Sequence, residues 1–247
     1  MKILIDTNIF LDFYRFNSQP VNIFNTLLEN IDRIILTDQI IQEFERSREG
    51  VIKNLKQKFQ NESKLDDFSS SYLQNLEEFK DLIAIQKSYR SKQKDVIIRI
   101  EEILQKPALD PIAKFFKEFV NESIKRDKVY YTTNEIIERA EKRKRVGNPP
   151  ASDKYSLGDE INWEIVLENL KEDIVIVGRD NTYTNNLTFL QKDYHKKTGC
   201  YIATLTESIT IALDKIGIET SNELIDEENK FIEVLKHSNE FWKPQTK

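Results

Sequence analysis

Three short, mainly apolar runs, each followed by a polar side chain, constrain the fold of this chain most strongly. They span residues 2–5, 34–36 and 174–177. Runs of this length that are rich in isoleucine and valine are typical of strands covered on both faces of a sheet. In open parallel sheets, ligands bind just beyond the carboxyl ends of the strands. The polar residues that follow these runs are therefore the first candidates for a functional site.

Segments in which apolar residues recur every three or four positions separate these runs and predict helices. A further short strand is predicted at residues 200–204. Strands that alternate with helices indicate an α/β protein with a mainly parallel sheet and right-handed connections. The predicted fold class is therefore α/β, with helices between the strands of one central sheet.

Residues 61–145 differ from the rest of the chain because they are densely charged and carry no strand pattern. Their apolar spacing predicts four helices, and Thr132 and Glu135 have the spacing of a capping box at the start of the last one. No stretch rich in glycine or serine marks either boundary. We therefore interpret residues 1–247 as a single domain that contains a large helical insertion at 61–145.

The bulk composition excludes several classes of protein. The net charge of −5 and the pI of about 5.4 do not indicate a nucleic-acid binder, although an acid cluster that holds metal lowers the net charge without repelling a polyanion. The single cysteine, Cys200, excludes a disulfide framework and a cysteine-rich zinc site. No apolar stretch is long enough to span a membrane, and no signal peptide is present. We expect a cytoplasmic protein without a membrane partner.

Four acids occupy related places in this pattern. Asp6 and Asp180 follow the first and third runs, Glu43 lies in the helix after the second, and Asp159 begins the helix before the third. Each acid alone is explained equally well as a helix cap or as a partner of the helix dipole. A converging set of carboxylates is costly unless a cation neutralises it, and oxygen ligands select Mg²⁺ or Mn²⁺. Such ions activate water for attack at phosphorus.

A basic run precedes the third of these acids. Its residues are Arg139, Lys142, Arg143, Lys144 and Arg145. Cations at the end of a helix complement its dipole, which is the simpler explanation. A loop at 147–153 then leads to Asp159, and this neighbourhood favours a patch that contacts substrate phosphates. We predict this role for Arg143, Lys144 and Arg145.

With these features the chain resembles the PIN-domain nucleases. The opening Ile5-Asp6-Thr7-Asn8 matches their first motif, and Glu43, Asp159 and Asp180 match the second, third and fourth acids in order. The residues from Arg143 through Gly147-Asn148-Pro149-Pro150 and Gly158-Asp159 to Trp163 resemble a larger PIN-like subgroup with a long helical insert. The resemblance covers about residues 1–60 and 145–210.

The resemblance implies a three-layer α/β/α PIN-like fold and cleavage of phosphodiesters, usually in RNA, with Mg²⁺ or Mn²⁺. It implies that Asp6, Glu43, Asp159 and Asp180 are catalytic metal ligands, which Asn8 and Thr37 orient by hydrogen bonds. Thr182 stands where many members have a further acid, which implies that a second metal site is weak or forms only with substrate. A role as a toxin or phage-defence effector follows from analogy alone, and it leaves open an inhibitory protein partner and a homodimer.

Two other functions compete with the predicted metal-dependent endoribonuclease. A non-catalytic scaffold that binds RNA or protein through its helical insertion is supported by the missing acid at Thr182. A metal-dependent phosphatase of the haloacid-dehalogenase type also uses aspartates at strand ends. That family needs a second aspartate where this chain has Asn8, so it ranks below the other two.

Overall fold

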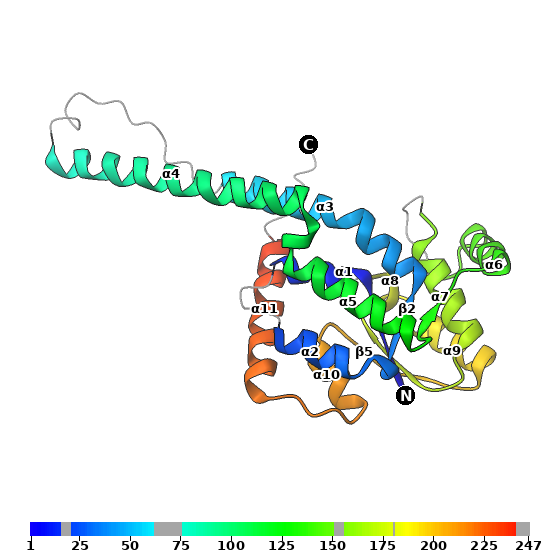
Figure 1. Ribbon diagram of the computed structural model, residues 1–247. Helices are drawn as coiled ribbons and strands as arrows, with labels where there is room; N and C mark the ends of the chain where they lie inside the picture. Colours follow the sequence, from blue (N-terminus) through cyan, green and yellow to red (C-terminus); the bar gives the residue numbers. More distant parts are fainter. Residues whose placement is uncertain (16–20, 62–75, 151–155, 180, 241–247) are drawn as a thin grey trace. The chain divides into compact units, whose positions relative to one another are not determined.

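The computed structural model describes residues 1–15, 21–61, 76–150, 156–179 and 181–240 (Figure 1). Its strands are β1 (Lys2–Ile5), β2 (Ile34–Thr37), β3 (Val129–Tyr130), β4 (Ile174–Val177) and β5 (Ile202–Thr206). Its α-helices are α1 (Thr7–Asp12), α2 (Val21–Glu29), α3 (Asp38–Asn61), α4 (Glu77–Gln105), α5 (Pro111–Lys125), α6 (Asn134–Arg145), α7 (Gly158–Asn169), α8 (Asn181–Thr184), α9 (Leu187–Thr198), α10 (Ile209–Lys215) and α11 (Asn222–Glu240). Among the helices in these ranges, none has a stretch long and apolar enough to cross a bilayer.

The described strands form one parallel sheet in the order β3-β2-β1-β4-β5, which confirms the predicted α/β class. The central strands β1 and β4 are paired from Lys2 opposite Ile174 to Ile5 opposite Val177. All four residues of β4 are fully buried because helices cover the sheet on both faces. The chain winds outward from β1 in one direction and from β4 in the other, so the strand order reverses between these two strands. This is the place where parallel sheets bind ligands.

Right-handed connections put α1, α2, α3 and α5 on one face of the sheet and α7 and α9 on the other. Phenylalanines hold the first layer together: Phe24 stacks on Phe115 and Phe44 on Phe116, each with 3.8 Å between ring centroids. The second layer is built around Trp163, which is fully buried and lies 6.0 Å from the ring of Tyr194. These layers confirm the three-layer α/β/α arrangement.

The chain divides into two compact units, of which the sheet-bearing one comprises Met1–Arg46 and Phe115–Lys247. The other, Ser47–Lys114, is helical. In it α3 and α4 run antiparallel, as the contacts from Lys56 to Glu101 and from Phe59 to Gln93 show. The sequence predicted an insertion at 61–145, so the helical unit begins and ends earlier than those boundaries.

A buried ion pair organises the base of the helical unit. Arg48 Nη2 lies 2.7 Å from Asp110 Oδ2, and both side chains are buried. The other carboxylate oxygen of Asp110 accepts hydrogen bonds from the backbone N–H groups of Ile112 and Ala113. Asp110 therefore joins α3 to the start of α5, where its charge also complements the helix dipole.

Some local predictions were wrong. The segment 61–145 was predicted to be wholly helical, but it contains β3, whose two residues are too short to show a strand period. Two of the helices predicted there are parts of the single helix α4. The cap of α6 is Thr133, whose Oγ1 accepts from Ile136 N, whereas Thr132 binds the carboxylate of Asp38 through its hydroxyl at 2.7 Å. That long-range bond shifts the predicted capping box by one residue.

The last strand also begins later than predicted, at Ile202 instead of residue 200. The backbone N–H of Cys200 donates to Thr198 Oγ1, and that of Tyr201 donates to Asp173 Oδ1 at 2.8 Å. Side chains thus take the hydrogen bonds that a strand neighbour would otherwise receive. The carbonyl of Tyr201 nevertheless accepts from Ile174 N at 3.0 Å, so the ladder between β4 and β5 begins with that carbonyl.

Candidate active site

Asp6 lies at the reversal point of the sheet, directly after β1. Its backbone N–H donates to Val177 O at 2.9 Å, so its position is set by the end of β4. A Cβ atom added to Gly178, the residue after β4, would lie 3.5 Å from the Asp6 Cβ. Asp6 is 9% exposed. Asp6 therefore lies beside the end of β4, between the ends of the two central strands.

Glu43 reaches the same place from the second turn of α3. One of its carboxylate oxygens, Oε2, accepts a hydrogen bond from Thr7 Oγ1 at 3.0 Å. Thr7 is fully buried at the start of α1 and directly follows Asp6. On the other side of Thr7, Asn8 Nδ2 donates to Asp6 Oδ2 at 3.2 Å. Thr7 therefore binds the carboxylate of Glu43, and the next residue, Asn8, binds that of Asp6.

Asp159 comes to this edge in the first turn of α7. A Cβ atom on the preceding Gly158 would lie 3.0 Å from Gln39 Nε2 and 3.9 Å from Glu43 Oε2. Because a glycine stands at position 158, the start of α7 can lie this close to the first turns of α3. We call Asp6, Glu43 and Asp159 the acidic edge.

Thr37 fixes how α7 and α3 meet. Its buried hydroxyl donates to Asn162 Oδ1 at 2.5 Å and accepts from Ile40 N at 3.0 Å. It therefore caps α3, which carries Glu43, and at the same time holds α7, which carries Asp159. The contact is to a neighbouring helix, whereas the sequence predicted that Thr37 orients the metal ligands directly.

The fourth predicted acid, Asp180, lies outside the described residues. Within the described part of the chain, no group of three or more His, Cys, Asp or Glu side chains is close enough to hold a metal ion. The donors at the acidic edge are carboxylate oxygens, with the hydroxyl of Thr7 and the amide of Asn8 beside them. Such a donor set fits a hard divalent cation of the Mg²⁺ type and does not fit a soft metal.

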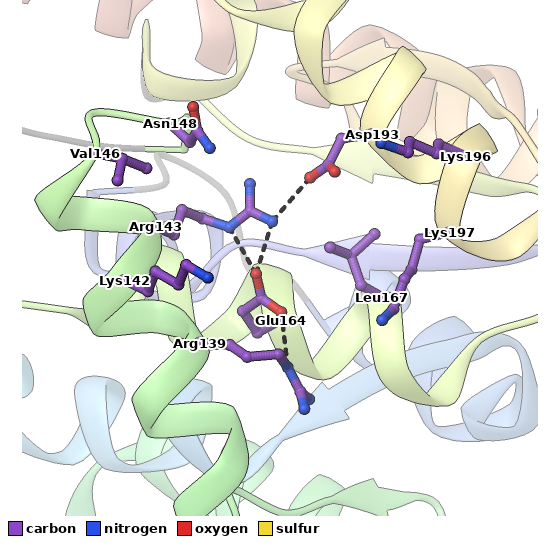
Figure 2. Close-up of a pocket in the computed structure, with 10 residues that line it drawn as sticks. All are labelled: Arg139, Lys142, Arg143, Val146, Asn148, Glu164, Leu167, Asp193, Lys196 and Lys197. Atoms are coloured by element: carbon purple, nitrogen blue, oxygen red, sulfur yellow. Dashed lines mark hydrogen bonds and ion pairs between the residues drawn. The ribbon is translucent and has the colours of Figure 1, made fainter.

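The residues predicted to contact substrate phosphates lie in different surroundings from one another. Arg143 is nine-tenths buried and binds Glu164, Asp193 and the carbonyl of Pro149 (Figure 2). Lys144 Nζ donates to Ser156 O at 2.6 Å and lies 3.4 Å from the buried carboxylate of Glu160. Arg145 is exposed. Arg143 and Lys144 therefore hold protein groups in place, and Arg145 alone of the three faces solvent.

Sequence reasoning missed three residues that shape the acidic edge: Thr7, Gln39 and Asn162. Thr7 stands inside the motif with Asp6 and Asn8, so its position was a usable signal. Gln39 and Asn162 contact partners more than 100 residues away in the chain. No local pattern could have identified these two.

Comparison with known proteins adds one finding. The family model described as PIN domain matches residues 3–183, which is most of the chain and includes every member of the acidic edge. Neither the curated proteins nor the solved structures gave a match. The matched range runs from β1 past β4, the strands between which the acidic edge lies. The protein therefore belongs to the PIN domain family, whose members are generally nucleases.

Proposed function

We propose that this protein is a metal-dependent endoribonuclease whose active site is the acidic edge. The observation that carries the proposal is the position of Asp6 and Glu43, which come from different elements to the reversal point of a PIN-domain sheet, with the start of α7 beside Glu43. Structural acids are usually paired with cations on their own surface. Asp6 and Glu43 come from distant parts of the chain, and Asn8 and Thr7 bind their carboxylates, which favours a metal-binding function.

Asp6, Glu43 and Asp159 are the proposed holders of Mg²⁺ or Mn²⁺, together with Asp180. Such an ion, when bound there, would activate water and neutralise charge on the phosphate. Two neighbouring residues orient these carboxylates by hydrogen bonds. Asn8 orients the Asp6 carboxylate, and Thr7 orients that of Glu43. Such hydrogen bonds hold ligands in one geometry before the ion and the substrate arrive.

Thr182 supports a site with few protein ligands. It is buried, at 7% exposure, and offers no carboxylate where many family members have one. RNA, whose phosphates are themselves oxygen ligands, then completes the site for any further ion. A bound divalent ion would offset part of the negative charge of the acidic edge and so lower its repulsion of a polyanion.

The test is a cleavage assay with labelled single-stranded RNA, structured RNA and single-stranded DNA, in Mn²⁺, Mg²⁺ or chelator. Asp6→Asn and Glu43→Gln should each lower the cleavage rate about a thousandfold or more. Glu45→Gln is the matched control, because Glu45 is exposed on the same helix two residues from Glu43. It should change the rate less than about twofold.

Thermal unfolding of each variant separates loss of the site from loss of the fold. Cleavage by Asp6→Asn at the wild-type rate would contradict the proposed site. Absence of cleavage by folded wild-type protein in either metal, with RNA binding that survives chelator, would favour the scaffold function.

A further inference from the structure

A hollow of about 400 Å³ lies between α6, α7 and α9 in the sheet-bearing unit (Figure 2). We call it the basic hollow. Its lining residues are Arg139, Lys142, Arg143, Val146, Asn148, Glu164, Leu167, Asp193, Lys196 and Lys197. Five of them are cationic and two are acidic, in a chain whose net charge is −5. The hollow is therefore positive where the protein as a whole is negative.

The centre of the basic hollow is a rigid network. Arg143 donates to Glu164 Oε1 through Nε at 2.8 Å, and its Nη2 lies 2.9 Å from Asp193 Oδ2. The indole N–H of the fully buried Trp163 donates to the same Asp193 oxygen at 3.0 Å. Arg139 adds a second guanidinium to Glu164 (Figure 2). Arg139 also binds Glu168 at 2.9 Å, so the two arginines face three acids and leave one negative charge in this network. The three lysines around it outnumber that one charge.

The remaining cations stand on two sides of this network. Lys142 comes from α6, and Lys196 and Lys197 come from α9 (Figure 2). All three are exposed, and none has an ion-pair or hydrogen-bond partner among the described residues. Each lies in the last turn of its helix, where the dipole favours a cation. The dipole does not explain why lysines from two separate helices line one hollow.

The basic hollow is linked to the acidic edge by α7. Asp159 is in the first turn of this helix, and Glu164 and Leu167 follow five and eight residues later. At a rise of 1.5 Å per residue they lie roughly 7 and 12 Å farther along the axis. A stacked nucleic-acid strand advances about 3.4 Å per nucleotide, so this axial distance corresponds to about two to four nucleotides.

We propose that the basic hollow binds a backbone phosphate of the RNA substrate, about two to four nucleotides from the bond that is cleaved. The inference rests on the proposed function and names the part of the protein that holds the strand. Lys142, Lys196 and Lys197 contact the phosphate as flexible point charges, which suits a backbone bound without regard to sequence. Leu167 and Val146 give the hollow an apolar wall for the adjoining sugar or base. Arg143 positions this surface and is not itself a phosphate ligand.

Equilibrium binding tests the proposal separately from cleavage. Fluorescence anisotropy measures a labelled single-stranded RNA binding to full-length Asp6→Asn protein in Mg²⁺. The hollow variant carries Lys142→Gln, Lys196→Gln and Lys197→Gln. The control carries Lys117→Gln, Lys215→Gln and Lys230→Gln, which are exposed lysines of the same unit outside the hollow. Both variants lose three positive charges, so they differ only in where those charges lie on the protein.

The hollow variant should bind about thirtyfold more weakly, with a salt slope lower by about 0.7, because one neutralised phosphate of a single strand contributes about that much. The control should weaken binding less than about threefold. Equal loss in both variants would overturn the proposal, since net charge would then explain the binding. No RNA binding by the Asp6→Asn protein would also overturn it.

The last binding measurement uses a poly-glutamate peptide in place of RNA. If the hollow variant loses this peptide and keeps RNA, the hollow is a protein-binding surface and the proposal fails. The two proposals fail in different ways. Metal-dependent cleavage that needs Asp6, combined with identical binding by both triple variants, would retain the nuclease and reject the phosphate site.

Discussion

The acidic edge and the basic hollow lie at different points along α7, and the carboxylates in the two regions have different kinds of partner. At the acidic edge, Asp6 accepts a hydrogen bond from an amide and Glu43 accepts one from a hydroxyl. In the hollow, Glu164 is bound to two guanidinium groups. Neutral donors orient a carboxylate but leave its charge, whereas arginines cancel it. The comparison sets a carboxylate bound by arginines apart from two carboxylates that accept hydrogen bonds from neutral groups, which is the arrangement that the proposed metal site uses.

The largest expected effect is on stability in the hollow. Glu164→Ala should lower the free energy of unfolding by about 3–5 kcal/mol, because it leaves the buried Arg143 without its main partner. Asp6→Asn at the acidic edge should change it by less than about 1 kcal/mol. Urea denaturation at pH 7 measures both. Similar losses in the two variants would remove the distinction between the two regions.

The next effect concerns the link between α3 and α7. Thr37→Val should cost about 2–3 kcal/mol, because Asn162 Oδ1 and Ile40 N lose a partner inside the protein. A double-mutant cycle with Asn162→Ala, measured by chemical denaturation, isolates the direct contact. Additive losses would show that the two side chains do not stabilise each other.

The third prediction concerns the effect of metal on stability, which should depend on the acidic edge and not on the basic hollow. Mn²⁺ at ten times its dissociation constant should raise the free energy of unfolding by about 1.4 kcal/mol, because only the folded protein gathers the carboxylates. Glu43→Gln should abolish this gain, whereas Glu164→Gln should keep it on a less stable protein. Differential scanning calorimetry with and without chelator gives the measurement. A gain that survives Glu43→Gln would place the metal elsewhere.

The smallest effect belongs to the layer beneath the hollow. Tyr194, buried beside Trp163, donates its hydroxyl to Glu172 O at 2.6 Å, so Tyr194→Phe should cost about 1 kcal/mol at neutral pH. Burial raises the pKa of Tyr194 above its ordinary value of 10.0. The folded state thus keeps its proton where the unfolded state loses it. This part of the stability is complete below about pH 10 and falls as the pH rises.

Unfolding measured from pH 8 to 11 tests the alkaline part of this prediction. The wild type should lose more stability over this range than Tyr194→Phe, which lacks the titrating group. Parallel curves for the two proteins would contradict the assigned effect of burial.

Local pattern predicted much of the fold because burial leaves a regular trace in the sequence. The isoleucines and valines of β1 and β4 indicated strands buried on both faces, and they are central in the sheet. Asp159 was predicted at a helix start and lies in the first turn of α7. The family followed from these residues in order, and the PIN domain match confirms it.

Predictions that depend on distant partners were less successful. Thr132 and Thr133 look alike to a local rule, and only the bond from Thr132 to Asp38 decides which of them caps α6. The basic run of α6 gave no sign that Arg143 would be buried, because Glu164 and Asp193 lie far from it in the sequence.

The sequence by itself determined the strand and helix periods, the order of the acids and hence the family, since these depend on neighbouring residues. Only the tertiary structure decided which charges cancel. Ion pairing falls steeply with distance, and folding alone brings Lys142 of α6 and Lys196 of α9 to one hollow. The same folding places Thr7 of α1 against Glu43 of α3. The order of the acids along the chain could therefore be predicted from the sequence, and the contacts around them could not.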